Sequence, residues 1–368
     1  MNDFHGIIFA YSPEKELSEL TRLRTAAALP FCGRYRMIDF SLSAMTNAGI
    51  RNVGVIMQRD YQSLLDHLGS GKAWDLSRKQ GGLHMLPPFG LPEYHSGNYI
   101  GTIEALNAVS SYVRRIQEDN VVLMMGHLCA NIDLFSACTD HVASGADITA
   151  ICADHDPKKA LYRYVPGEDG FVKSILFSGS EGGLPSLECY IIRKSVLLDM
   201  MEQCRASNQY RFHHDAVSRF LQNGGKMGLY VHKGYAETVH SVKCYFDVSM
   251  DMLKSDVRHD IFNPARPVRT RAVEEVSTYY GEKALSHNCL VADNCIIEGD
   301  MENCIVFSGA RIEPGAKLKN CIVMSGCSVG KDAALTNVIV DRNVSISAGT
   351  ALMGSEKLPM VIPMGEVL

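Results

Sequence analysis

The chain lacks several features that would place it in whole classes of protein. No apolar run approaches the roughly 18 residues of a membrane span, and no basic, apolar leader opens the sequence. None of its twelve cysteines forms a C-x2-C pair, so we expect buried, reduced thiols rather than metal ligands. The net charge of −5 predicts no affinity for nucleic acid or for an anionic membrane surface. Together these absences indicate a cytoplasmic protein with no membrane or nucleic-acid partner.

Glycine is missing after the first apolar strand. The run His5–Ala10 predicts a buried strand, and the next residues, Tyr11-Ser12-Pro13-Glu14-Lys15-Glu16-Leu17, contain no glycine. A phosphate loop needs glycines, because backbone N–H groups must approach the anion at φ values that other residues resist. Pro13 removes one N–H donor, and the acidic residues would repel a triphosphate. The segment has the position of a phosphate loop without its chemistry.

Two domains are expected from the length of 368 residues and from a change of pattern along the chain. From residue 5 to about 255, apolar strands alternate with amphipathic helices, which predicts a largely parallel sheet covered by helices. Pro264 and Pro267 mark a linker. We place the α/β domain at residues 1–258, the linker at 259–284 and a second domain at 285–368.

The second domain repeats every 17 positions. Asn303-Cys304-Ile305-Val306 recurs as Asn320-Cys321-Ile322-Val323, and a third copy follows at Asn337-Val338-Ile339-Val340. Three apolar corners per repeat, separated by small and polar residues, predict a triangular parallel β-helix with faces of about six residues. Its interior rows are predicted to include Ile312, Val329 and Ile346, and also the stacked Cys289, Cys304 and Cys321. A solenoid of a few coils must cover its ends, which makes the domain a subunit contact in our interpretation.

A longer motif shows a resemblance to a known family. The segment Arg34-Tyr35-Arg36-Met37-Ile38-Asp39-Phe40-Ser41-Leu42-Ser43, followed by Asn47-Ala48-Gly49-Ile50, resembles glucose-1-phosphate adenylyltransferases. The resemblance covers nearly the whole chain. It implies a Rossmann-like nucleotidyltransferase domain and a C-terminal left-handed parallel β-helix of the hexapeptide type. It also implies a remnant nucleotide and sugar pocket, lined by Gln58, Gly101, Thr102 and Glu104.

The same resemblance shows what the chain has lost. In the family, a glycine-rich loop holds a nucleoside triphosphate, and two carboxylates hold the Mg²⁺ that bridges its phosphates. In an alignment without a gap, Tyr11, Ser12 and Glu14 fall on the three loop glycines, Glu16 on the loop arginine, and Ala26 on a lysine. The two metal carboxylates align with His127, in Gly126-His127-Leu128, and with Thr238.

Without phosphate donors and metal ligands, phosphoryl transfer loses most of its electrostatic stabilisation. The chain most resembles the non-catalytic, GlgD-type branch of the family, through Asn131-Ile132-Asp133-Leu134 and His240-Ser241. That branch implies a regulatory subunit in a hetero-oligomer with a catalytic glucose-1-phosphate adenylyltransferase, modulating ADP-glucose formation for glycogen. We then expect no metal or cofactor in this chain, with Mg²⁺ only in the catalytic partner.

Two other hypotheses remain open at this point. The chain could be a weak or altered sugar-phosphate nucleotidyltransferase, in which His127 binds a softer metal with Asp133 or Asp154. It could instead be a free-standing sugar-phosphate sensor that needs no partner. An aspartate at position 127 or 238 would have favoured catalysis.

A group of arginines surrounds the altered loop. Arg24, Arg34 and Arg36 fall on basic positions of the family, in the region where its regulators bind. They predict an anion site for a phosphorylated effector. Ordinary surface ion pairing would account for them equally well, because isolated surface pairs contribute little.

Overall fold

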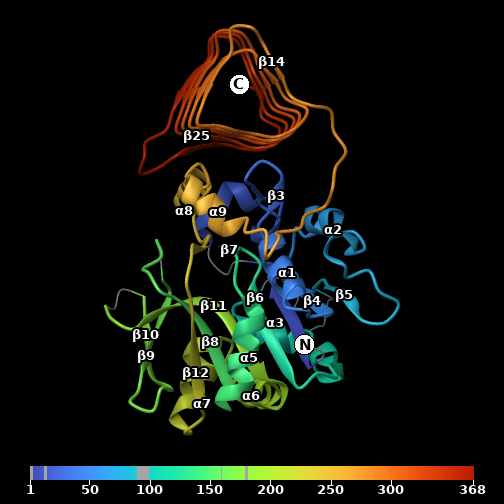
Figure 1. The fold of residues 1–368 in the computed structure, drawn as a ribbon, viewed down its shortest axis with the longest axis vertical. Helices are drawn as coiled ribbons and strands as arrows, with labels where there is room; N and C mark the ends of the chain where they lie inside the picture. Colours follow the sequence, from blue (N-terminus) through green and yellow to red (C-terminus); the bar gives the residue numbers. More distant parts are fainter. Residues whose placement is uncertain (1–2, 12–14, 89–98, 159, 179–180) are drawn as a thin grey trace.

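A nine-stranded sheet forms the centre of the N-terminal domain in the computed structural model, which describes residues 3–11, 15–88, 99–158, 160–178 and 181–368 (Figure 1). The strands are β1 Phe4–Phe9, β4 Asn52–Ile56, β5 Gly82–Leu86, β6 Asn120–Met125, β8 Ile148–Ala153, β9 Tyr162–Pro166, β10 Val172–Phe177, β11 Leu184–Arg193 and β12 Met227–His232. Neighbours β6, β1, β4 and β5 are parallel, and so are β8 and β12. Strand β11 is antiparallel to both β6 and β8. Strand β9 is antiparallel to both β10 and β11. The parallel strands that the sequence predicts are therefore present, and the sheet also contains the antiparallel strands β9, β10 and β11, which the sequence does not predict.

Helices cover both faces of this sheet. They are α1 Ile38–Asn47, α2 Gln62–Leu68, α3 Thr102–Ala108, α4 Ser110–Arg115, α5 Leu134–Ser144, α6 Lys194–Ala206, α7 Ser218–Gln222, α8 Val242–Asp251 and α9 Ser255–Ile261, with a π-helix at Phe212–Val217. Successive residues of β1 point to opposite faces, so Ile8 enters the core under α1 and α5, whereas Ile7 enters the core under α3, α4 and α6. No helix in the described part of the chain is both long and apolar enough to cross a bilayer.

The C-terminal domain is a left-handed parallel β-helix, as the 17-residue repeat predicts. Its three sheets have five strands each, in the orders β14-β17-β20-β23-β26, β15-β18-β21-β24-β27 and β16-β19-β22-β25-β28. Ile312, Val329 and Ile346 pair across successive coils and fill the interior. Cys304 and Cys321 are buried in the interior row, and Cys289 is only half-buried because it belongs to the first coil.

The strands of the β-helix are short. They are β14 Tyr279–Tyr280, β15 Leu285–His287, β16 Leu290–Val291, β17 Ile296–Ile297, β18 Asp300–Glu302, β19 Ile305–Val306, β20 Arg311–Ile312, β21 Lys317–Lys319, β22 Ile322–Val323, β23 Ser328–Val329, β24 Ala334–Thr336, β25 Val338–Val340, β26 Ser345–Ile346, β27 Ala351–Met353 and β28 Met360–Ile362. Because β14 pairs with β17, the first coil begins inside the segment 259–284 that the sequence predicts as linker. That coil lacks the repeated Asn-Cys motif before residue 288, which hides its start in the sequence.

One side face of the β-helix packs against the N-terminal domain. Figure 1 shows the triangular solenoid end-on, with the side that carries β25 facing α8 and α9. In each repeat two consecutive aliphatic residues are buried, because one points into the solenoid and the other points out. The outward row Ile305, Ile322 and Ile339 shares a core with Phe31 and Phe40 of the N-terminal domain.

A buried ion pair crosses the same interface. The guanidinium of Arg24 donates to both carboxylate oxygens of Asp341, and the two side chains are 2% and 1% exposed. Asp341 also accepts a hydrogen bond of 2.6 Å from the backbone N–H of Arg342. Tyr245 of α8 lies in the same core and donates to the carbonyl of Pro30 at 2.6 Å. Charge pairing and apolar contact thus hold the two domains in one arrangement.

We predict that either Arg24→Ala or Asp341→Ala destabilises the protein by about 3–5 kcal/mol, because each leaves an unpaired buried charge. The double variant Arg24→Met with Asp341→Leu should cost much less than the sum of the single changes. Urea unfolding followed by circular dichroism measures both. Additive losses in the double variant would show that the two side chains do not act as a pair.

Candidate functional site

The carboxyl ends of β6, β1 and β4 meet at one edge of the sheet. Tyr11, Gln58 and His127 each stand two residues after one of these strands. Ligand sites of open α/β sheets lie at this edge. The structure therefore brings together three positions that the sequence alone could place only along the chain.

A tyrosine stands at the start of the altered phosphate loop. The Tyr11 ring is buried, with its centroid 6.1 Å from that of Phe9 and 5.6 Å from that of Tyr99. Its hydroxyl has no hydrogen-bond partner among the described residues. Burial, reinforced by Tyr99 and Glu104, raises the pKa of Tyr11 well above its usual range. A bulky aromatic side chain thus occupies a position where the resemblance implies glycine.

Of the remaining positions of this loop, the two that the structure describes, Glu16 and Ala26, offer no side-chain donor to a phosphate. Glu16 is exposed in the short 3₁₀ helix Lys15–Thr21, and Ala26 is buried in a second one, Ala26–Ala28. Ser12 and Glu14 lie outside the described residues. Where the family has a lysine at position 26, this chain has a methyl group in the protein core.

The remnant pocket positions lie beside Tyr11. Gln58 donates through Nε2 to the carbonyl of Tyr99 at 3.4 Å. Gly101 caps α3 in an extended conformation, and a Cβ there would lie 2.2 Å from the carbonyl oxygen of Tyr210. Thr102 opens α3, and the buried Glu104 accepts a hydrogen bond from the backbone N–H of Ile100. The side chains of Gln58 and Glu104 are thus engaged with the protein itself.

The two positions aligned with metal carboxylates lie side by side. His127 precedes the short strand β7 Leu128–Ala130, and Thr238 ends β13 Ala236–Thr238, which pairs with β7 in antiparallel register. Thr238 pairs with Leu128, and the backbone N–H of Val239 donates to the carbonyl of His127 at 3.0 Å. Sequence positions more than a hundred residues apart therefore form one local site, as the resemblance implies.

This site does not fit Mg²⁺. His127 is 1% exposed, and its Nδ1 has no hydrogen-bond partner within the described part of the chain. Burial, together with His240, lowers the pKa of His127 to about 3, so the ring is neutral at ordinary pH. Mg²⁺ needs several hard oxygen ligands, whereas the site offers a neutral imidazole and the hydroxyl of Thr238. The described residues contain no group of three or more His, Cys, Asp or Glu side chains that could hold a metal ion.

Glu188 and His240 are the polar neighbours that the sequence did not single out as site residues. The ring of His240 meets that of His127 edge-on at 5.6 Å, and its Nε2 lies 3.6 Å from Oε1 of Glu188. Glu188 is buried at φ 52° within β11, where a non-glycine residue is strained. The positive φ is the one feature that distinguishes Glu188 from other strand residues, and φ cannot be read from the sequence. Asp133 and Asp154, which the sequence analysis considers as metal ligands beside His127, have other partners. Asp133 caps α5 by accepting a hydrogen bond from the backbone N–H of Ser136, and Asp154 contacts His155.

The predicted effector arginines separate into two groups. Arg34 and Arg36 line a cavity of about 520 Å³ between the two domains, together with Arg271 and Arg342. Arg24 lies outside this lining and is held by Asp341 beneath the interface. An anion bound in the cavity would therefore contact Arg34 and Arg36. Arg24 would affect this site only indirectly, by holding the two domains together through Asp341.

The cavity has an excess of positive charge. Four arginines line it against the three acids Asp66, Glu275 and Asp293. Arg36 donates to the carbonyl and hydroxyl of Ser63 at 2.8 and 2.7 Å. Burial, together with the neighbouring Arg342, lowers the pKa of Arg36 to about 10. A guanidinium whose pKa is lowered by a neighbouring guanidinium is stabilised by an anion placed between the two.

Sequence reasoning missed Arg342, although the repeat holds a signal for it. The positions 17 and 34 residues before it are Ser325 and Ser308, so an arginine breaks a row of small residues.

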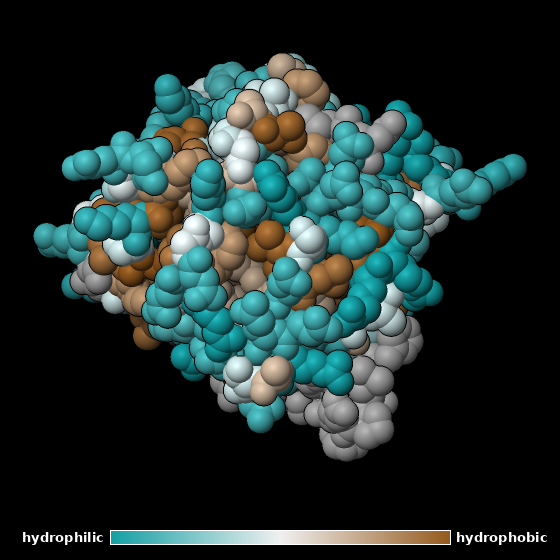
Figure 2. Space-filling model, turned by 90° about the horizontal axis from the view of Figure 1, so that it is seen from below, coloured by the Kyte–Doolittle hydropathy of each residue, from teal (hydrophilic) through white to brown (hydrophobic). Residues whose placement is uncertain are grey.

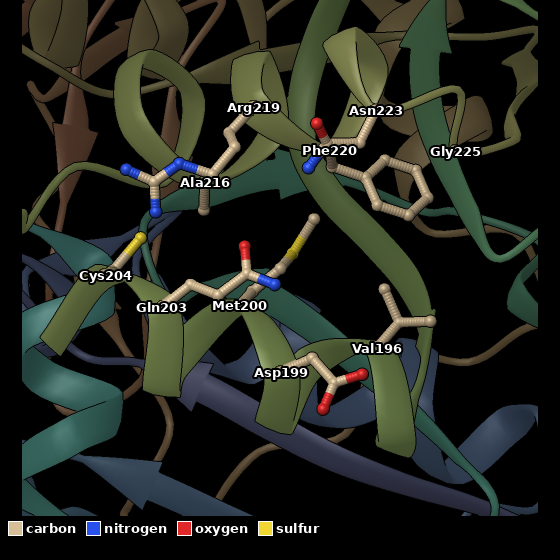
Figure 3. Close-up of a pocket in the computed structure, with 10 residues that line it drawn as sticks. All are labelled: Val196, Asp199, Met200, Gln203, Cys204, Ala216, Arg219, Phe220, Asn223 and Gly225. Atoms are coloured by element: carbon tan, nitrogen blue, oxygen red, sulfur yellow. The ribbon is translucent and has the colours of Figure 1, made fainter. Parts of the chain in front are cut away.

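A smaller cavity of about 200 Å³ lies between α6 and α7 (Figure 3). It is lined by Met200, Cys204 and Phe220, among others, and by none of the predicted site residues.

The neutral, buried His127 gives the site a pH signature. The unfolded chain binds a proton to this histidine near pH 6.5, whereas the folded chain does so only near pH 3. Because of this difference, the free energy of unfolding falls by about 1.4 kcal/mol per pH unit as pH drops from 6.5 toward 3. Above pH 6.5 the free energy of unfolding keeps its full value with respect to this histidine. His127→Asn should therefore reduce the stability difference between pH 7.5 and 5.5 by roughly that amount. Urea unfolding at the two pH values measures it, with exposed His287→Asn as control. An unchanged difference in His127→Asn would contradict the assigned burial.

Comparison with known proteins agrees with this geometry. Residues 6–171 match the nucleotidyl transferase family, and residues 272–357 match the GlmU-like C-terminal hexapeptide family. The glycogen biosynthesis protein GlgD of Bacillus subtilis is 31% identical over 318 residues, covering 86% of this chain and 83% of the relative. GlgD of Geobacillus stearothermophilus is 32% identical over 321 residues, covering 86% and 82%. The glucose-1-phosphate adenylyltransferase of Bacillus thuringiensis is 27% identical, covering 84% of each chain. The chain belongs to the family that comprises GlgD glycogen biosynthesis proteins and glucose-1-phosphate adenylyltransferases.

Proposed function

We propose that this chain is a cytoplasmic, non-catalytic regulatory subunit of bacterial glycogen biosynthesis. It forms a hetero-oligomer with a catalytic glucose-1-phosphate adenylyltransferase and modulates the formation of ADP-glucose from ATP and glucose 1-phosphate. The catalytic partner supplies the Mg²⁺ site and the chemistry. The names of the relatives support the pathway, and the chemistry of the altered site supports the non-catalytic role.

One observation carries the proposal. The two positions that the resemblance assigns to Mg²⁺ are adjacent in space, yet they present the neutral imidazole of His127 and the hydroxyl of Thr238. In-line phosphoryl transfer without a bound divalent cation loses the charge stabilisation that the family's mechanism depends on. Tyr11 and Ala26 stand in place of a loop glycine and a lysine, so these two positions supply no phosphate donor either.

A regulatory role also needs a place for a signal to bind. The interdomain cavity supplies four guanidinium groups, from the N-terminal domain, the linker and the β-helix. Arginine recognises phosphate groups through paired hydrogen bonds. A phosphorylated metabolite bound here contacts both domains, so its binding is sensitive to how the two domains dock.

The isolated chain is predicted to make no ADP-glucose from ATP, Mg²⁺ and glucose 1-phosphate above a buffer blank. His127→Asp with Thr238→Asp should also remain inactive, because the loop around Tyr11 still lacks phosphate donors. A coupled assay for diphosphate release measures both proteins. Turnover by the unmodified chain that disappears in His127→Ala would instead favour a weak or altered nucleotidyltransferase.

The interdomain cavity is predicted to bind phosphorylated ligands. Arg342→Ala and the exposed Arg34→Ala should each weaken binding of glucose 6-phosphate by about tenfold or more, since a charge-assisted hydrogen bond contributes about 1.5–3 kcal/mol. Isothermal titration calorimetry on the isolated chain measures this effect, with inorganic phosphate as a second probe. Arg205→Ala, on the exposed end of α6, is the matched control. Equal affinity in all four proteins would count against this site.

A further inference from the structure

A buried carboxylate–imidazole pair lies in the wall of the interdomain cavity. Nε2 of His67, on α2, is 2.6 Å from Oδ1 of Asp39, on α1. Asp39 is fully buried and His67 is 7% exposed. His67 is one of the side chains that line the cavity, and it is the one histidine among the lining residues that the structure describes. The cavity with four arginines thus also has a titratable ring in its wall.

The geometry of the pair determines what a proton does there. A ring nitrogen this close to a carboxylate donates its hydrogen to it, so neutral His67 carries its hydrogen on Nε2 and a second proton binds at Nδ1. The pair then changes from one net negative charge to none. Because both side chains are buried, this change acts on an anion in the cavity with little screening by water or salt.

The charged groups around His67 are evenly balanced while its ring is neutral. The positive groups are the four guanidinium groups of the cavity, from Arg34, Arg36, Arg271 and Arg342. The acidic groups are Asp66, Glu275 and Asp293 of the lining, and Asp39 beside the ring. Four cations therefore face four carboxylates, and a proton on His67 gives this set a net positive charge.

Further contacts hold the pair in this position. The backbone N–H of Arg36 donates to Oδ2 of Asp39 at 3.0 Å, so both carboxylate oxygens have a partner. Trp74, the one tryptophan of the chain, meets the ring of His67 edge-on, with the two ring centroids 5.5 Å apart. Its Nε1 donates to the carbonyl of Arg269 in the linker at 3.1 Å. The indole is therefore fixed beside His67, where its emission depends on the charge of that ring.

We propose that binding of an anion in the interdomain cavity is coupled to the uptake of a proton by His67. A proton on the ring removes the net negative charge of the pair and so favours the anion. By the reciprocity of linked equilibria, the anion favours the protonated ring to the same extent. Affinity for anions therefore rises as pH falls through the range in which His67 titrates. The coupling rests on the anion site of the proposed function and adds a response to pH.

Isothermal titration calorimetry of the full chain with sodium sulfate tests the coupling. The charge of sulfate is constant near neutral pH, whereas a phosphate monoester has a second pKa of about 6 and would add its own proton exchange. Titrations at about pH 6, 7 and 8 cover the range in which histidine side chains change charge, with ionic strength held constant because salt screens charges. At each pH, two buffers with different heats of ionisation give the number of protons taken up.

The unmodified chain should bind sulfate about threefold or more tightly at the lowest pH than at the highest, since coupling to one full proton changes affinity about tenfold per pH unit. Each bound sulfate should take up a fraction of one proton. His67→Asn should bind sulfate without proton uptake and without this dependence on pH. His287→Asn, at an exposed position of β15, is the matched control and should behave as the unmodified chain.

The fluorescence of Trp74 gives a second readout that needs no variant. An imidazolium ring quenches a neighbouring indole, so the emission should fall as His67 takes up its proton. Sulfate should move the midpoint of this change to higher pH. A midpoint that sulfate leaves in place would contradict the coupling.

A variant of the cavity is needed to locate the bound sulfate. Hydrophilic side chains also cover the face of the N-terminal domain that is turned away from the β-helix, with apolar ones interspersed (Figure 2). An anion can associate weakly with such a surface. Weaker binding at every pH in Arg342→Ala assigns the sulfate to the cavity. Equal binding in this variant would place the sulfate elsewhere and overturn the inference.

The remaining outcomes separate this inference from the anion site of the proposed function. Sulfate that binds in the cavity without proton uptake overturns the coupling and leaves the anion site in place. Proton uptake that persists in His67→Asn assigns the proton to another group and also overturns the coupling. A chain that binds no sulfate at any pH contradicts the anion site and the coupling together.

Discussion

Arg24 and Asp341 form an ion pair that neither residue can leave without exposing a buried charge to an apolar surrounding. The pair joins the loop region of the N-terminal domain to the residue directly after β25 of the β-helix, next to the aliphatic row Ile305, Ile322 and Ile339. Because both contacts must form together, the two domains have one relative position. That position creates the arginine-lined cavity, since Arg34 and Arg36 come from one domain and Arg342 from the other.

The edge of the sheet that carries Tyr11 and His127 is well packed. Strands β6, β1 and β4 still bring their carboxyl ends together, and β7 still pairs with β13. The side chains that replace the expected ligands are themselves buried: Tyr11 packs against Tyr99, and His127 against His240. Buried neutral groups cost less than unpaired carboxylates at such positions. With neutral side chains at these positions, no bound nucleotide or metal ion is needed to neutralise buried charge at this edge of the sheet.

Much of the fold follows from the sequence, because its periodicities are strong. Apolar runs such as Ile148–Cys152 became buried strands, and the 17-residue step became coils in register. The apolar spacing over Ile103–Arg115 predicts a single helix, but the structure divides it at Val109, where the backbone leaves the helical conformation. No glycine or proline marks this break in the sequence. The first coil begins before its motif does, since pairing of Tyr279 with Ile296 depends on a neighbour rather than on a local pattern.

The site was predictable where it rests on aligned positions and unpredictable where it rests on tertiary contact. His127 and Thr238 were identified by alignment, whereas Glu188 comes to lie beside His240 through folding alone. Arg342 of the interdomain cavity is marked in the sequence only by a break in the repeat. The most direct test of the account is the rate of ADP-glucose formation by the catalytic subunit as purified chain is added. The account predicts that turnover, or its response to a sugar phosphate, changes until a fixed ratio of the two chains is reached. A rate and an effector response that stay constant at micromolar concentrations of both chains would contradict it and favour a free-standing sensor.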